Sequence, residues 1–167
     1  PSRDYNFFRK RLRFSADVEL SGDVATLSQR QIRFALSSTT GSSNYTDDAI
    51  AIRIRGDNAV TLSCKQNRPN TNTENATLLV NNVNIGSPAT GFELTLDATD
   101  YVLTVRHAGG TGSTSWSGAH GLIAAQWGPR GDSTMQMEVR RNTGAGAGAG
   151  QIVTGAWDNL SVERLAP

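Results

Sequence analysis

The chain has 167 residues, a length that suits one domain with its own core, so a single domain over residues 1–167 is expected. Its 16 basic and 15 acidic side chains leave a net charge of +1, without the strong positive field typical of nucleic-acid-binding proteins. A nucleic-acid partner is therefore not expected. The chain also has no apolar run near 18 residues, so a membrane partner is not expected either. The single cysteine, Cys64, excludes an internal disulfide and a cysteine-based zinc site.

Alternating apolar and polar residues predict β-strands along the first half of the chain. In residues 10–20, Leu12, Phe14 and Val18 alternate with charged or small polar side chains, as in a half-buried strand. The same alternation predicts strands at residues 31–36, 49–55, 59–65 and 77–85. Gly56-Asp57-Asn58 predicts a tight hairpin turn, because these residue types tolerate positive φ.

The clearest pattern lies between Gly91 and His107, where two alternating runs flank the polar turn 97–100. This arrangement is typical of an antiparallel hairpin with one buried face. The glycine-rich residues 108–120 are expected to form a loop. Residues 121–127, 133–140 and 151–165 are expected to be strands, with the run GAGAGAG at 144–150 as a hairpin connection.

No segment shows a helical period, and about ten strands are expected at the spacing found in sandwiches and barrels. The sequence therefore predicts an all-β fold, an antiparallel two-sheet β-sandwich.

Two segments near the C-terminus resemble a known fold family. The segment SGAHGLIAAQWG contains Gly121-Leu122-Ile123, and GAWDNLSVERL contains Trp157-Asp158-Asn159-Leu160. Together they resemble the concanavalin A-like jelly-roll sandwiches of carbohydrate-binding modules and laminin-G-like domains. The resemblance implies a jelly roll with a concave glycan-binding face and a structural calcium near the last strand. Asp158 is the candidate calcium ligand, since carboxylate oxygens suit this cation, although a solvated turn carboxylate would show the same sequence.

Arginine dominates the basic residues, because only Lys10 and Lys65 are lysines. Several arginines alternate with the apolar positions and are expected on the sheet faces that point away from the core: Arg33, Arg53, Arg55, Arg106 and Arg140. Guanidinium groups bind carboxylate and sulfate with two hydrogen bonds, which points to an acidic glycan as the ligand. Arginines scattered over a solvated sheet would look the same.

Aromatic and histidine side chains complete the candidate ligand-binding set. Trp116 and Trp127 offer flat rings on which a sugar could stack, although Trp127 also suits the core. His107 and His120 bracket the expected loop, and with Tyr101 they could abstract a proton in a lyase reaction. Two ordinary histidines at loop edges are the alternative.

The sequence favours a binding module over an enzyme, because its five glutamates lie on separate elements and form no carboxylate pair for glycoside hydrolysis. The first expectation is a non-catalytic carbohydrate-binding module for a uronate or sulfated polysaccharide, extracellular or at the cell surface and part of a larger multidomain protein. The alternatives are a small jelly-roll polysaccharide lyase, with Tyr101 or His107 as base, and a structural or assembly jelly roll.

Overall fold

The structure is a computed structural model in which ten strands are the only long regular elements of the described chain. It describes residues 5–22, 30–38, 49–65, 77–108, 112–124, 127, 133–141 and 153–166. The strands are β1 (Leu12–Gly22), β2 (Arg30–Ser37), β3 (Ala49–Arg55), β4 (Ala59–Lys65), β5 (Thr77–Asn84), β6 (Ala89–Leu96), β7 (Asp100–His107), β8 (Ser113–Ala119), β9 (Thr134–Arg141) and β10 (Val153–Arg164). Among the described residues, no helix is long and apolar enough to cross a membrane.

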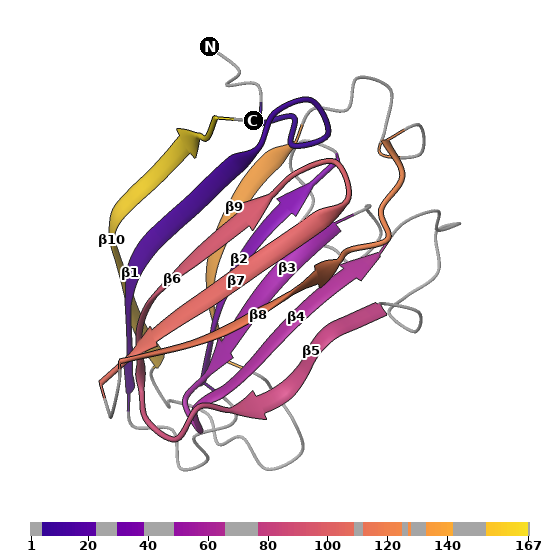
Figure 1. Cartoon of the computed structure of the whole chain (residues 1–167). Coiled ribbons are helices and arrows are strands. Elements are labelled where there is room, and N and C mark those ends of the chain that lie inside the picture. Colours follow the sequence, from indigo (N-terminus) through magenta and orange to yellow (C-terminus); the bar gives the residue numbers. More distant parts are fainter. Residues whose placement is uncertain are drawn as a thin grey trace.

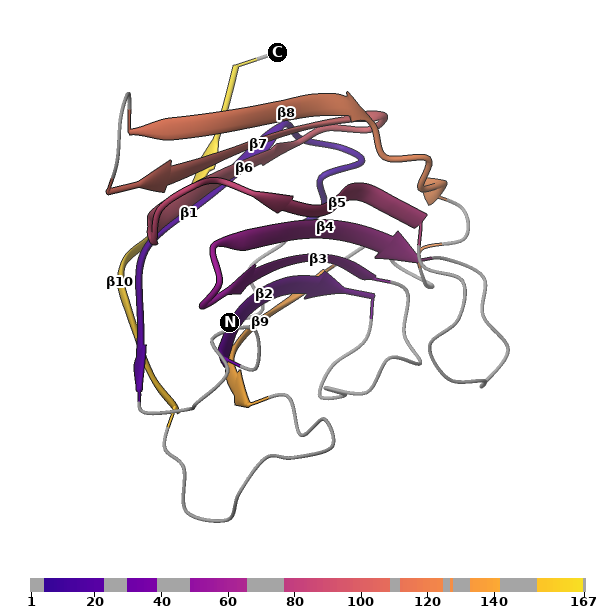
Figure 2. The same cartoon turned by 90° about the horizontal axis from the view of Figure 1, so that it is seen from below.

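The strands form two antiparallel sheets of five that pack face to face. The first sheet has the order β10-β1-β6-β7-β8, and the second has the order β5-β4-β3-β2-β9. Figure 1 shows the strands of both layers running along a common diagonal, and Figure 2 shows the two layers from below. The predicted two-sheet β-sandwich is confirmed.

The core lies between the sheets because each strand turns its alternate apolar side chains inward. Ile52 of β3 stands opposite Leu62 of β4 and Phe34 of β2, and all three are almost fully buried. Phe34 meets Phe92 of the first sheet with ring centroids 5.1 Å apart, so aromatic contacts join the two layers. The residues between these apolar positions therefore point to the outer faces.

Local chemistry sets the predicted turns. Between β6 and β7 one carboxylate oxygen of Asp97 accepts hydrogen bonds from the backbone N–H groups of Thr99 (3.0 Å) and Asp100 (2.9 Å). These two bonds hold the pKa of Asp97 below its usual value. Between β3 and β4, Asn58 takes a positive φ of 65°, as the Gly-Asp-Asn sequence predicts.

Three predictions about the C-terminal half need correction. Residues 108–120 were expected to be a loop, but Ser113–Ala119 forms strand β8, which pairs with β7 along its whole length. Because this segment consists largely of serine and glycine, it does not show the apolar alternation of a typical strand. Pairing with β7, which alternates strongly, makes it a strand. Residues 121–124, predicted as part of a strand, are not in one. Residues 144–150, predicted as a hairpin connection, lie outside the described part, and the strands on either side, β9 and β10, belong to different sheets and do not pair as a hairpin would.

Candidate functional site

The outer face of the second sheet carries a concentration of polar and cationic side chains. Because Ile32, Phe34 and the residues paired with them fill the core, Gln31 and Arg33 of β2 point to the outer face. We call this surface the arginine face and define it by Gln31, Arg33, Arg53, Arg55 and Glu138. Three of these five residues, Arg33, Arg53 and Arg55, were predicted from strand alternation.

The strand register places four of these outer residues in one line across the sheet. Arg53 of β3 pairs with Thr61 of β4 on one side and with Arg33 of β2 on the other, and Arg33 pairs with Glu138 of β9. We call this line the arginine row. Neighbouring strands are about 4.8 Å apart, so the two arginines lie directly beside each other. Like charges in this position destabilise a sheet, which favours a role for the pair in binding an anion.

Arg33 and Arg55 each have an acidic neighbour. Arg33 Nη1 lies 3.6 Å from Glu138 Oε1, with side-chain exposures of 9% and 18%. Arg55 binds both carboxylate oxygens of Asp57 in the β3–β4 turn, with Nε donating to Oδ1 over 3.0 Å. Its Nη1 also donates to Asn82 Oδ1 (3.3 Å). The charge of Arg55 is therefore largely balanced within its own turn.

Arg53 differs from the other two arginines of this face. Within the described part of the chain it forms no salt bridge with a carboxylate, and its side chain is half-buried rather than fully covered. It lies between a neutral hydroxyl and a second guanidinium in the arginine row. This combination makes Arg53 the group on the face that is best placed to bind an external anion.

Small side chains continue the face next to the arginine row. Two residues farther along each strand, Ser63, Ala51 and Ala35 lie side by side on β4, β3 and β2. Gln136 of β9 extends this line beside Ala35. Ala35 and Ala51 are buried and Ser63 is half-buried, so this strip is largely covered and the arginine row is the part of the face that offers charged groups. Lys65, on the same side of β4, lies beyond the strip.

Some members of this face were missed in the sequence. Gln31 and Glu138 alternate with apolar residues just as the arginines do, but the sequence does not show which strands are neighbours. Arg140 pairs with Gln31 through the backbone register, so its position belongs to the same side of the sheet.

Arg106 does not belong to the arginine face, so its grouping with the other predicted arginines is wrong. It extends from β7 across β6 on the outer face of the first sheet, where Nη2 donates to Asp17 Oδ1 (2.6 Å) and to the Ala16 carbonyl (3.3 Å). Asn159 and Arg106 both donate to the carboxylate of Asp17 and hold its pKa below the usual value. Arg106 therefore has a structural partner, and alternation cannot show which sheet a strand joins.

The path of Arg106 requires a glycine at position 91. A methyl group there would lie 2.6 Å from Arg106 Cζ and 2.8 Å from the Ala16 carbonyl oxygen. We expect Gly91→Ala to lower the free energy of unfolding by about 1–3 kcal/mol, as overpacking does, measured by urea denaturation. Gly118→Ala is the control, because the nearest atom to its methyl group would be Tyr101 Cε1 at 3.5 Å, an ordinary van der Waals distance.

A smaller cost of Gly91→Ala in an Arg106→Ala background would confirm that the clash involves this side chain. Equal costs in the two backgrounds would contradict the explanation.

The histidines and the tyrosine lie apart from the arginine face. His107 contacts hydroxyls with both ring nitrogens, Ser87 at 3.1 Å and Thr114 at 3.2 Å, near the end of β7. His120 is only 2% exposed. His120 is therefore a buried residue, and its role in ligand binding stays a prediction. Tyr101 is buried and donates to the Leu79 carbonyl (3.4 Å).

His120 is held in one tautomer inside the protein. Its Nε2 donates to the Asp97 carbonyl over 3.1 Å, and its Nδ1 accepts from the Leu122 N–H over 3.0 Å. Its own carbonyl accepts from the Cys64 thiol at 3.1 Å, and burial raises the pKa of that thiol to about 11. Cys64 is thus a buried structural thiol.

The two tryptophans do not form an exposed sugar platform. Trp127 is fully buried, and its indole N–H donates to Ser133 Oγ (3.1 Å). Trp116 stands opposite Leu103 on the inward side of β8 and packs against the core with partial exposure. Trp127 is therefore a core residue, which was the alternative to a sugar-binding role. Trp116 lies in strand β8 and not in the expected loop.

Asp158, the predicted calcium ligand, lies exposed on β10 opposite Asp17 of β1. Its Oδ1 accepts the backbone N–H of Asn159 (2.8 Å), and Asn159 Nδ2 donates to Asp17 Oδ2 (2.6 Å). Within the described ranges, no three His, Cys, Asp or Glu residues group together as a metal site would require. A structural calcium at Asp158 stays a prediction.

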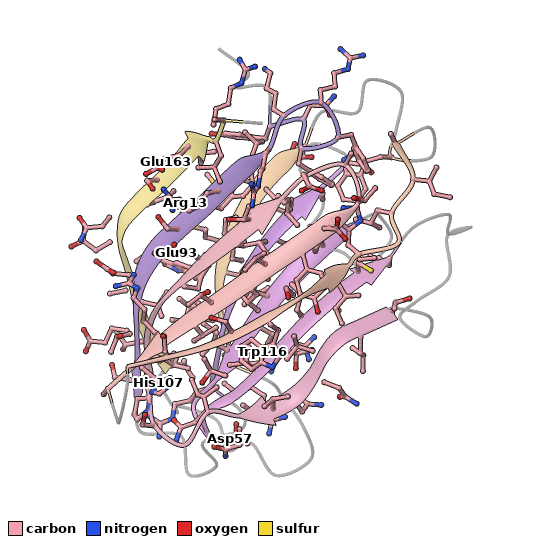
Figure 3. All side chains as sticks on the ribbon, in the orientation of Figure 1. Arg13, Asp57, Glu93, His107, Trp116 and Glu163 are labelled. Carbon is pink, nitrogen blue, oxygen red and sulfur yellow. The ribbon has the colours of Figure 1, made fainter. Side chains whose placement is uncertain are left out.

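The first sheet carries a second arginine–glutamate cluster that serves as a comparison. Arg13 of β1 lies 2.5 Å from Glu163 Oε2 and 3.8 Å from Glu93 Oε2. Figure 3 shows these three side chains together, with His107 toward the opposite end of the strands. The cluster is more exposed than the Arg33–Glu138 pair and lies on the other sheet. Its residues therefore provide matched control positions for the arginine face.

Two solved structures share the fold. A variant of alginate lyase A1-II′ matches 98% of this chain and 66% of its own, with a TM-score of 0.57 and 13% identity. An alginate lyase from Pseudomonas aeruginosa is covered to 68% and matches 97% of this chain, with a TM-score of 0.51 and 13% identity. No protein-family model and no curated protein matches the sequence.

These similarities support the concanavalin A-like jelly-roll sandwich that the C-terminal motifs suggested. The chain spans about two thirds of the length of both lyases. The first expectation, a non-catalytic carbohydrate-binding module, is contradicted, because both similar structures are named as lyases rather than binding modules. They agree better with the alternative of a jelly-roll polysaccharide lyase.

Proposed function

We propose that this protein is a polysaccharide lyase that binds a uronate-containing polysaccharide on the arginine face. Arg53 carries the proposal, because it is a half-buried guanidinium without a carboxylate partner among the described residues, directly beside Arg33. The two lyases of similar fold, both named for alginate, support a uronate polymer as the substrate class. Since such polymers lie outside cells, the proposal includes an extracellular or cell-surface location.

The reaction follows from the chemistry of a uronate. A guanidinium that binds the carboxylate with two hydrogen bonds neutralises its charge and makes the proton on the adjacent carbon C5 easier to remove. Loss of this proton forms a C4–C5 double bond while the C4–O bond to the next sugar breaks. Arg53 would bind the carboxylate, and Arg33 would add positive charge beside it.

The wild-type protein tests this proposal directly. We expect it to release unsaturated products, seen as rising ultraviolet absorbance, from a uronate polymer such as alginate but not from a neutral glucan. The rate should fall as salt rises from about 0.05 to 0.5 M, because added ions screen the attraction between arginine and carboxylate.

Absence of unsaturated product from a panel of uronate polymers would overturn the lyase proposal. Equal activity on the neutral glucan would overturn the role of the arginines.

A further inference from the structure

A lyase needs a base close to the carbon that loses its proton, and C5 is bonded directly to the carboxylate carbon. The base must therefore lie next to the group that binds the carboxylate. The residues first predicted for this role, Tyr101 and His107, lie on the first sheet, away from the arginine face. The search for a base thus turns to the second sheet.

Three ionisable groups other than arginine occur among the described side chains near this face. Asp57 already binds Arg55 through both carboxylate oxygens. Lys65 lies four residues along β4 from Thr61, the neighbour of Arg53. At about 3.3 Å per residue, this places it roughly 13 Å from the arginine row along the strand. Neither group is positioned beside a carboxylate bound at Arg53.

Glu138 satisfies the positional requirement. It belongs to the same arginine row as Arg53, with only β2 between their strands. Two strand spacings amount to about 10 Å between the backbones of β3 and β9, and Arg33 of β2 lies between the two residues. The side chain of Glu138 is 18% exposed, and that of its neighbour Arg33 is 9% exposed.

We propose that Glu138 is the catalytic base of the elimination, an inference that rests on the proposed lyase function. Its carboxylate takes the C5 proton of a uronate whose own carboxylate is bound by Arg53 and Arg33. The electron pair of the C–H bond forms the C4–C5 double bond, and the C4–O bond breaks. The leaving oxygen takes a proton from water, and Glu138 returns its proton to solvent.

Besides binding the substrate carboxylate, Arg33 orients Glu138. Its Nη1 lies 3.6 Å from Glu138 Oε1, close enough to orient the carboxylate. Arg33 also stands opposite Arg53, so one guanidinium lies between the base and the main carboxylate-binding group. Glu138 is therefore next to Arg33, the second group that binds the substrate carboxylate, and two strands away from Arg53.

Glu138→Gln tests the inference, since glutamine has nearly the same shape but cannot accept the proton. We expect kcat on a uronate polymer to fall by about 10²- to 10⁴-fold, the usual contribution of a general base. The Kd for the same polymer should change less than about threefold, measured by calorimetry. Glu138→Ala provides a second variant, and added formate should restore part of its turnover.

Glu163→Gln is the matched control, because it removes the acid partner of Arg13 on the first sheet and should leave kcat unchanged. If the wild type cleaves and Glu138→Gln retains more than about a tenth of kcat, the base assignment falls while the lyase function stands. Joint loss of binding and turnover without rescue by formate would also overturn it. A wild-type protein that cleaves no uronate polymer would overturn both proposals.

Discussion

Replacement of Arg53 by alanine is expected to weaken binding of a uronate oligomer by about 10- to 100-fold without destabilising the protein. Hydrogen bonds to a charged group contribute about 1.5–3 kcal/mol, and each 1.4 kcal/mol corresponds to a factor of ten in affinity. The unfolding free energy should stay the same or rise slightly, because the variant removes one member of a like-charge pair across β2 and β3. Loss of binding without loss of stability is the pattern expected of a ligand-binding residue.

Calorimetric titration and urea denaturation of the same variant measure the two effects. Arg13→Ala is the matched control, since Arg13 is also an outer-face arginine but is paired with Glu163 on the first sheet. It should bind the oligomer as tightly as the wild type does. Arg53→Lys should recover only part of the affinity, because lysine supplies charge without the two-pronged geometry. Wild-type affinity in Arg53→Ala would rule out this residue as the carboxylate-binding group.

Replacement of Trp127 by alanine is expected to lower the free energy of unfolding by about 3–5 kcal/mol, as for other fully buried large aromatic residues. The ring makes edge-to-face contacts with Phe7 (5.3 Å) and Phe8 (5.8 Å). Its removal would also leave Ser133, a buried residue, without the indole donor. For a chain of this length, the melting temperature should fall by roughly 6–20 °C.

Urea denaturation of two further variants separates the contributions. Trp127→Phe keeps most of the ring but loses the indole N–H, so we expect an intermediate loss of about 1–2 kcal/mol. Ile123→Ala, at a nearby residue that is 54% exposed, should change the stability by less than about 0.5 kcal/mol. A cost below about 1 kcal/mol for Trp127→Ala would contradict its place in the core.

Much of the fold was predictable because alternation is a local property of each strand. The run of Ile50, Ile52 and Ile54 shows which side of β3 faces the core, and hence that Arg53 and Arg55 face outward. The turns at residues 56–58 and 97–100 were also predictable, since Gly, Asn and Asp favour these backbone conformations and hydrogen bonds. These features depend on side chains within a few residues of one another.

Polar strands and aromatic exposure were less predictable. β8 consists mainly of serine, threonine and glycine, and it becomes a strand because β7 offers a complete edge for pairing. The residues just before Trp127 do not show that its side chain is buried. Phe7 and Phe8, near the N-terminus, pack against its ring. Such contacts join residues more than 100 positions apart, which no short window of sequence reveals.

The sequence by itself determined that the chain is all-β, which strands exist in the first half, and that Arg33, Arg53 and Arg55 point away from the core. Only the tertiary structure decided which strands are neighbours. Glu138 lies beside Arg33 in the second sheet, whereas Arg106 lies in the first sheet and binds Asp17. The physical reason is that alternation reports one strand's buried face, whereas strand order depends on how all ten strands bury their apolar faces together.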